Sequence, residues 1–271
     1  MIDTTVKVAD KLVGEYDIIP NPWIKEFYNE NQELVSVEFH GITKIRSNAF
    51  NGCTNLALTS LPAGVTSIGD SAFYNCKNLA LTSLPESLTS ISDSAFSDCT
   101  SLALTSLPAG VTSIGAGAFV SCYSLALTSL PDGLTSIGIG AFNNCKNLAL
   151  TSLPDGLTVI PMEAFNSCIN LALTSLPEGL TCIGAGAFYN CTGLALTSLP
   201  EGLTTISFGA FQNCTSLTSI TFKGTPTTIE SIAFDGCTNL TEIKVPWSEG
   251  AVSGAPWGAT NATITYNYVG E

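Results

Sequence analysis

Residues 111–133 read VTSIGAGAFVSCYSLALTSLPDG, and close copies of this 23-residue unit fill most of the 271-residue chain. In every copy the dipeptide Ala-Phe is followed by a cysteine three residues after the phenylalanine. Because a unit of this length is too short to bury its own apolar side chains, it must stack on its copies, and the period predicts a repeat solenoid. The nine phenylalanines that share the register are Phe50, Phe73, Phe96, Phe119, Phe142, Phe165, Phe188, Phe211 and Phe234.

Each unit is expected to contain two extended segments and one tight turn. The segment LALTSLP occurs unchanged seven times, from residues 56–62 to residues 194–200, and predicts a strand around Ala-Leu-Thr-Ser-Leu. A second short extended segment is expected at Thr-Ser-Ile, and a tight or 3₁₀ turn through Ala-Phe-x-x-Cys. Pro62 and its equivalents end the strand, and Gly64 and most of its equivalents permit the corner that follows. The prediction is a solenoid of stacked parallel strands.

The N-terminal residues depart from the repeat, as expected of a cap that covers the first turn. Residues 34–40 align with the strand half of the repeat at residues 217–223, which predicts the first strand. Asn21 followed by Pro22 is typical of the N-cap and first position of a helix, so we expect a helix from Trp23 to Glu30.

The C-terminal residues also differ from the repeat. Residues 245–247 and 256–257 contain tryptophans next to prolines, and residues 264–268 alternate in polarity, which predicts aromatic packing and a last strand. The predicted domains are an N-terminal cap with the first half-repeat strand at 1–41, nine repeats at 42–248 and a C-terminal cap at 249–271.

The repeat consensus, [LV]-T-x-I-x-x-x-A-F-x-x-C-x-x-L-A-L-T-S-L-P-x-G, resembles the BspA-like leucine-rich repeats of bacterial surface proteins and some protist proteins. The match covers about residues 34–248 in nine registered copies. The resemblance implies a right-handed leucine-rich-repeat solenoid or arc, and an adhesin-like protein that is secreted or on the cell surface. Residues 1–10 hold two acidic side chains and no apolar block, so they are not typical of a secretory signal. Either the protein stays inside the cell, or its signal lies outside this sequence.

Nine of the ten cysteines occupy one repeat position, which indicates packing rather than chemistry. There is no C-x-x-C pair, and His40 is the only histidine, so we expect no zinc site and no cofactor. Stacked side chains that point the same way rarely satisfy disulfide geometry. We therefore expect buried free thiols, with Cys182 as the one candidate for an exposed or reactive thiol. The nine are Cys53, Cys76, Cys99, Cys122, Cys145, Cys168, Cys191, Cys214 and Cys237.

The ionisable residues argue against catalysis and against polyanionic partners. A single histidine near the N-terminal cap offers no matched acid and base, so the chain is predicted not to be an enzyme. The formal net charge of −13 and nine scattered basic residues predict no nucleic-acid binding. Residues 100–131 are uncharged but are interrupted by Pro108 and several glycines, which predicts no membrane insertion. An acidic row without calcium-loop spacing predicts a solvated edge at Glu86, Asp132, Asp155, Glu178 and Glu201.

Two sets of residues are candidates for ligand contact. The threonine of each LALTSLP segment is expected to point outward, because Leu58 and Leu61 point inward, and the row could form a hydroxyl-bearing ladder. Threonine also stacks well in strands, so the row has a purely structural alternative. These threonines are Thr59, Thr82, Thr105, Thr128, Thr151, Thr174 and Thr197. The second set comes from the variable positions after each Phe and each Cys, where an aromatic residue can anchor a contact or simply reflect surface drift: Tyr74, Tyr123 and Tyr189.

These observations favour a binding module over an enzyme. The expected ligand is a protein or a glycan, as implied by the resemblance to adhesins. The alternative is a structural spacer or a phage-associated surface component, in which the solenoid mainly presents its ends. The sequence leaves the oligomeric state open.

Overall fold

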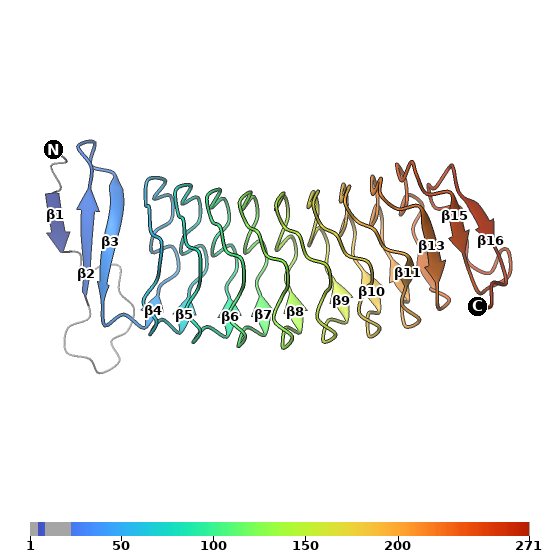
Figure 1. Ribbon diagram of the computed structural model, residues 1–271, viewed down its shortest axis with the longest axis horizontal. Coiled ribbons are helices and arrows are strands. Elements are labelled where there is room, and N and C mark those ends of the chain that lie inside the picture. Colours follow the sequence, from blue (N-terminus) through green and yellow to red (C-terminus); the bar gives the residue numbers. More distant parts are fainter. Residues whose placement is uncertain (1–4, 9–22, 271) are drawn as a thin grey trace.

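The computed structural model describes residues 5–8 and 23–270, which form an elongated stack of turns from the N-terminal to the C-terminal end (Figure 1). Successive turns lie side by side, and the elements in this part of the chain are β-strands joined by turns. Where short strands of consecutive turns pair, they do so in parallel with a shift of 23 residues, as in Ser113 with Ser136 and Ile114 with Ile137. The predicted β-solenoid of 23-residue repeats is confirmed.

A short strand recurs at Thr-Ser-Ile, where the second extended segment was predicted. In each turn the isoleucine of this strand points into the core and the residue before it faces outward, so two residues are enough to join neighbouring turns. The strands are β4 (Lys44–Ile45), β5 (Ser67–Ile68), β6 (Ser90–Ile91), β7 (Ser113–Ile114), β8 (Ser136–Ile137), β9 (Val159–Ile160), β10 (Cys182–Ile183), β12 (Thr205–Ile206) and β14 (Thr228–Ile229).

The prediction of a strand around Ala-Leu-Thr-Ser-Leu is wrong for most turns. In the described turns between residues 56 and 177 this segment forms no strand, and the chain bends at Thr82 and its next four equivalents. The reason is the spacing of the leucines. Leu81 and Leu84 are both buried although they are three residues apart, whereas a regular strand places residues two apart on one face. Longer strands form only where alternation returns, in β13 (Ser219–Phe222) and β15 (Glu242–Lys244), with β11 (Ser198–Leu199) paired to β13.

The predicted tight turn through Ala-Phe-x-x-Cys is confirmed. Cys122 N donates to Phe119 O at 3.1 Å within the turn, and Phe119 N donates to Ala141 O of the next turn at 2.8 Å. The residues two before and two after the phenylalanine adopt left-handed conformations, with φ of 60° at Gly117 and 56° at Ser121. This geometry explains why glycine, serine and asparagine are common at these two positions.

The phenylalanines form one continuous stack along the core, with every ring fully buried. The ring of Phe119 lies 5.6 Å from that of Phe96 and 5.5 Å from that of Phe142, and the planes differ by less than 10°. Leucine, isoleucine and cysteine side chains of each turn complete the core around this stack. The assignment of Ala-Phe to the inward position is confirmed.

The N-terminal end is an antiparallel sheet of β1 (Thr5–Val8), β2 (Trp23–Tyr28) and β3 (Leu34–His40). The prediction that residues 34–40 form the first strand is confirmed. The helix predicted from Trp23 to Glu30 is wrong, because this segment is rich in aromatic and β-branched residues and pairs with β3 through a turn. That turn is closed by Asn29 N, which donates to Glu33 O at 3.0 Å. The proposed helix cap at Asn21 and Pro22 lies outside the described residues.

The C-terminal end continues the register of the solenoid without the consensus residues. Trp257 follows Phe234 by 23 residues, is fully buried, and accepts a hydrogen bond of 2.9 Å from Phe234 N. Trp247 packs against Phe222 with ring centroids 5.2 Å apart. The last strand, β16 (Thr263–Thr265), pairs in parallel with β15. The predicted aromatic packing and last strand are confirmed, while the domain boundaries at 41 and 248 stay predictions.

Candidate binding surface

The seven threonines of the LALTSLP segments are all exposed, as their predicted outward orientation requires. Five of them, from Thr82 to Thr174, lie at bends rather than in a continuous strand. One backbone hydrogen bond joins neighbouring segments there, such as Ala126 N to Leu104 O at 3.0 Å. The row is therefore a surface that bears hydroxyl groups, and in its first six members the backbone forms no strand. Its members are Thr59, Thr82, Thr105, Thr128, Thr151, Thr174 and Thr197.

The three candidate tyrosines belong to two different rows and are not brought together. Tyr74 and Tyr189 each follow a core phenylalanine but are five turns apart, whereas Tyr123 follows a core cysteine. Tyr123 is 39% exposed, and the ammonium group of Lys146 lies 5.1 Å from its ring centroid. This cation already covers part of the ring that a ligand would contact.

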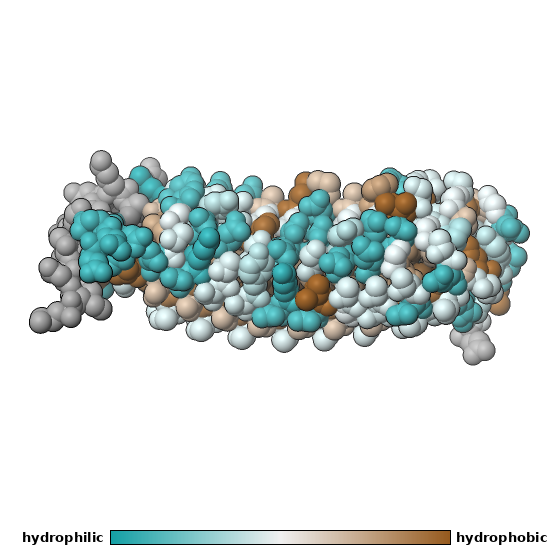
Figure 2. Space-filling model, turned by 90° about the horizontal axis from the view of Figure 1, so that it is seen from above, coloured by the Kyte–Doolittle hydropathy of each residue, from teal (hydrophilic) through white to brown (hydrophobic). Residues whose placement is uncertain are grey.

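A further row of exposed apolar residues lies three positions before the phenylalanine, and sequence reasoning missed it. Ile139, Met162 and Phe208 are 52%, 45% and 54% exposed. Figure 2 shows hydrophobic residues along one long edge of the molecule, over its middle and C-terminal turns. The sequence signal that could have indicated this row is the variability of the position. Its nine residues are Ser47, Asp70, Asp93, Ala116, Ile139, Met162, Ala185, Phe208 and Ser231.

A shallow pocket of about 310 Å³ opens in this row. It forms because Ala185 is small while its equivalents in the two neighbouring turns, Met162 and Phe208, are large. Gly186 adds no side chain, and a Cβ there would lie 3.7 Å from Tyr189 Cβ. The pocket is lined by Met162, Glu163, Asn166, Ala185, Gly186, Tyr189, Phe208, Gly209 and Gln212. Of the three candidate tyrosines, Tyr189 lines this pocket, whereas Tyr74 and Tyr123 do not.

Glu163 is the only charged residue that lines this pocket. Its carboxylate oxygen Oε2 accepts a hydrogen bond of 3.1 Å from Asn143 Nδ2. Its φ of 56° lies in the left-handed region, where the equivalent residues Gly140 and Gly186 also lie. An ionised carboxylate accepts several hydrogen bonds, so Glu163 keeps capacity for a cationic group at the pocket rim.

The cysteines form a structural ladder in the core. Desolvation by burial raises the pKa of Cys76 and of Cys237 to about 12 and holds the pKa of Cys145 well above its usual range. Eight of the nine repeat cysteines are buried and Cys53 is partly exposed; all are free thiols, as predicted. Cys182 is partly exposed in β10, and its reactivity stays a prediction. Among the described residues, no group of three His, Cys, Asp or Glu side chains is placed to hold a metal ion.

The acidic row is exposed, in agreement with a solvated edge. Its members Glu86, Asp132, Asp155, Glu178 and Glu201 all face solvent. Lys223 Nζ lies 2.5 Å from Glu178 Oε1, so one charge of the row is paired.

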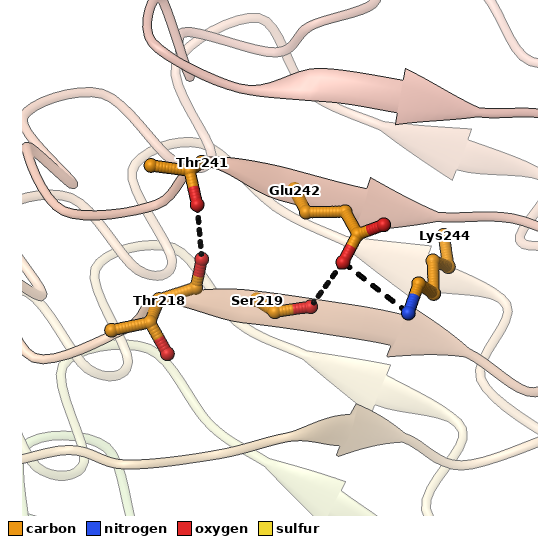
Figure 3. A network of polar contacts seen from close by, with 5 residues as sticks. All are labelled: Thr218, Ser219, Thr241, Glu242 and Lys244. Atoms are coloured by element: carbon orange, nitrogen blue, oxygen red, sulfur yellow. Dashed lines mark hydrogen bonds and ion pairs between the residues drawn. The ribbon is translucent and has the colours of Figure 1, made fainter.

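A polar network crosses the outer face of the C-terminal sheet (Figure 3). Glu242 on β15 accepts a hydrogen bond of 3.3 Å from Ser219 Oγ on β13 and forms an ion pair of 3.2 Å with Lys244. Thr241 Oγ1 donates to Thr218 O at 3.3 Å. Lys244 Nζ also lies 5.2 Å from the ring centroid of Tyr268. The network joins the last turns to one another, so we assign it a structural role.

In the part of the chain that is described, no helix is long and apolar enough to cross a bilayer. The family model of the BspA type leucine rich repeat region matches residues 24–149 and 135–252. No curated protein matches the sequence.

Among solved structures, a leucine-rich repeat protein from Bacteroides ovatus is similar with a TM-score of 0.60 and 22% identity, over 92% of this chain and 77% of that one. A leucine rich repeat protein from T. pallidum has a TM-score of 0.50 and 30% identity, over 62% of this chain and 86% of that one. A leucine rich cell surface protein from Faecalibacterium prausnitzii has a TM-score of 0.40 and 23% identity, over 93% of this chain and 96% of that one.

Proposed function

Since the chain belongs to the BspA-type leucine-rich-repeat family, we propose that it is a non-catalytic binding protein whose rigid solenoid recognises a protein partner at a bacterial cell surface. The observation that carries this proposal is the exposed apolar row at Ile139, Met162 and Phe208. Elsewhere the repeats are nearly identical and present mostly small polar residues. Exposed apolar side chains that gather in one place are typical of protein contact sites.

A glycan ligand would draw on different residues. Sugars need many directed hydrogen bonds, which the threonine row could offer, whereas the apolar row offers mainly hydrophobic contact. Tyr74 and Tyr123, each exposed on its own, would add peripheral contacts in either case. The spacer alternative uses none of these surfaces and requires only that the two ends be held apart.

The test is direct binding of the immobilised, folded chain to extracellular-matrix proteins and to bacterial surface glycans. We expect saturable binding to at least one protein, with the thermally unfolded chain as the control. Binding to glycans alone would overturn the choice of a protein partner. A folded chain that binds neither set would favour the spacer and contradict the proposal.

A further inference from the structure

The pocket beside Met162 lies in a variable part of the repeat. The turns at residues 114–119 and 183–188 read Ile-Gly-Ala-Gly-Ala-Phe, whereas the sixth turn reads Ile160-Pro-Met-Glu-Ala-Phe165. Glu163 thereby occupies a left-handed position that the turns on either side fill with glycine. For a residue with a Cβ this conformation costs about 1–2 kcal/mol. Asn48, Ser71 and Ser94 adopt the same conformation at the equivalent position of other turns, so the strain belongs to the turn, and the feature that distinguishes Glu163 is its charge at the pocket.

The walls of the pocket favour an aromatic occupant. The thioether of Met162 and the rings of Tyr189 and Phe208 are all adaptable partners for another ring. The volume of about 310 Å³ is at the lower end of the range of ligand sites, and it suits one large side chain rather than an oligosaccharide.

The charge at the rim favours a cation beside that aromatic group. Glu163 is the one ionic residue of the lining, and Asn143 satisfies only part of its carboxylate. Gln212, which also lines the pocket, donates through Nε2 to Asp235 Oδ2 at 2.9 Å, and this places a second carboxylate in the next turn. The chain as a whole carries a formal charge of −13, which attracts cationic segments from a distance.

We propose that this pocket holds an aromatic side chain of the partner protein while a lysine or arginine next to that side chain pairs with Glu163. The inference rests on the proposed function and specifies its site and its ligand chemistry. Met162 and Phe208 stand on either side of Ala185 in the neighbouring turns, and Gly186 and Tyr189 belong to the same lining.

The two methionines of the chain make this proposal testable. They are Met1 and Met162, so labelling methionine methyl groups with ¹³C gives a signal from the pocket residue Met162 and only one other signal. The probe is the peptide acetyl-Lys-Phe-Lys-amide, compared with acetyl-Glu-Phe-Glu-amide and acetyl-Lys-Ser-Lys-amide. We expect a saturable shift of the Met162 signal with the first peptide only, because a ring must enter the pocket while a cation pairs at the rim.

Two variants separate the apolar and ionic contributions. Ala185→Leu fills the pocket, and the fold should accept it because the neighbouring turns carry Met162 and Phe208 at the same position. Glu163→Gln keeps the shape and removes the charge, with Glu86→Gln in the exposed acidic row as its matched control. We expect binding of the Lys-Phe-Lys peptide to weaken about tenfold in the first variant and about threefold in the second, and to be unchanged in the control.

Several outcomes would overturn the inference. Equal shifts with all three peptides, or undiminished binding by Ala185→Leu, would show that the pocket does not select a ring beside a cation. If the Met162 signal shifted with rising protein concentration in the absence of peptide, the pocket would be occupied by a second copy of the chain. A partner protein bound equally well by wild type and Ala185→Leu would overturn the pocket but leave the proposed function intact. If the Lys-Phe-Lys peptide bound at the pocket but no protein partner bound the chain, the proposed function would be contradicted and the inference about the pocket would stand.

Discussion

The thiol of Cys145 donates a hydrogen bond of 2.9 Å to the carbonyl oxygen of Phe119 in the preceding turn. The same bond, at 2.9–3.0 Å, recurs along the stack from Cys76 to Cys237. Each of these cysteines therefore fills a small apolar site and also gives a second hydrogen bond to a carbonyl oxygen that already accepts one from the backbone, as Phe119 O does from Cys122 N. Alanine would supply no donor at this position, and a leucine would not fit the same space.

The buried thiols predict loss of stability at alkaline pH. Burial raises the pKa of Cys76 and Cys237 from 9.0 to about 12 in the folded protein, whereas the unfolded chain ionises near the ordinary value. Stability is thus fully present below about pH 9 and falls as the pH rises from there toward 12, because unfolding releases protons. Urea unfolding at pH 7, 9 and 10 should show this decline.

The control for this prediction is Cys76→Ala, which removes one titrating thiol. Its stability should be lower at pH 7 but should decline less steeply between pH 9 and pH 10. A wild-type stability that stays constant up to pH 10 would contradict the burial of the thiols.

The phenylalanine stack predicts a large loss on truncation at its centre. Phe119→Ala should lower the free energy of unfolding by about 3–5 kcal/mol, because the rings above and below cannot close the cavity. Tyr123→Ala, four residues along and exposed, should cost less than about 1 kcal/mol. Chemical denaturation of the two variants measures the difference. An unchanged unfolding curve for Phe119→Ala would be inconsistent with the stack.

Much of this fold can be predicted from the sequence because the same spacing of buried side chains recurs in every turn. Fixed spacing of Phe, Cys and Ile leaves stacking as the only way to bury them, so the solenoid, the inward phenylalanines and the thiol ladder were all predictable. The prediction of a strand around Ala-Leu-Thr-Ser-Leu was wrong. The separation of Leu58 and Leu61 by three residues already argued against a regular strand, in which residues two apart share a face. The helix predicted for β2 rested on the local capping signal of Asn21 and Pro22 alone, and such a signal carries no information about pairing with β3.

The candidate site was harder to predict for a physical reason. A pocket between turns depends on the difference in size between equivalent residues, here Ala185 against Met162 and Phe208, and not on any local motif. The outward orientation of Thr59 and its equivalents was correctly inferred, but no sequence pattern placed Tyr189 next to Phe208. Comparison of all variable positions across neighbouring turns would have indicated the pocket.

The strained backbone at Glu163 predicts a gain in stability on substitution. Glu163→Gly should raise the free energy of unfolding by about 1 kcal/mol, because glycine adopts a φ of 56° without the clash of a Cβ. The same change at Glu86, which is not in the left-handed region, should destabilise by about 0.5–1 kcal/mol. Equal effects at the two sites would show that Glu163 is not strained. A gain in stability together with weaker binding of the Lys-Phe-Lys peptide is the expected trade-off.

The two tryptophans of the C-terminal end predict unequal costs for the same substitution. Their rings lie 6.4 Å apart and both are buried. Trp257 Nε1 donates to Ser253 O at 2.8 Å, whereas Trp247 Nε1 is buried and has no hydrogen-bond partner among the described residues. An unsatisfied buried donor costs about 1–3 kcal/mol, so Trp247→Phe removes a penalty while it loses some packing.

We therefore expect Trp247→Phe to change the free energy of unfolding by less than about 1 kcal/mol. Trp257→Phe should cost at least about 1 kcal/mol more, since it loses both packing and a satisfied hydrogen bond and leaves Ser253 O without its donor. Urea unfolding followed by circular dichroism compares the two variants under one condition. If Trp247→Phe were the more destabilising of the two, its indole N–H would have to be hydrogen-bonded in solution, for example to a buried water, and the aromatic cluster would be wetter than its packing indicates.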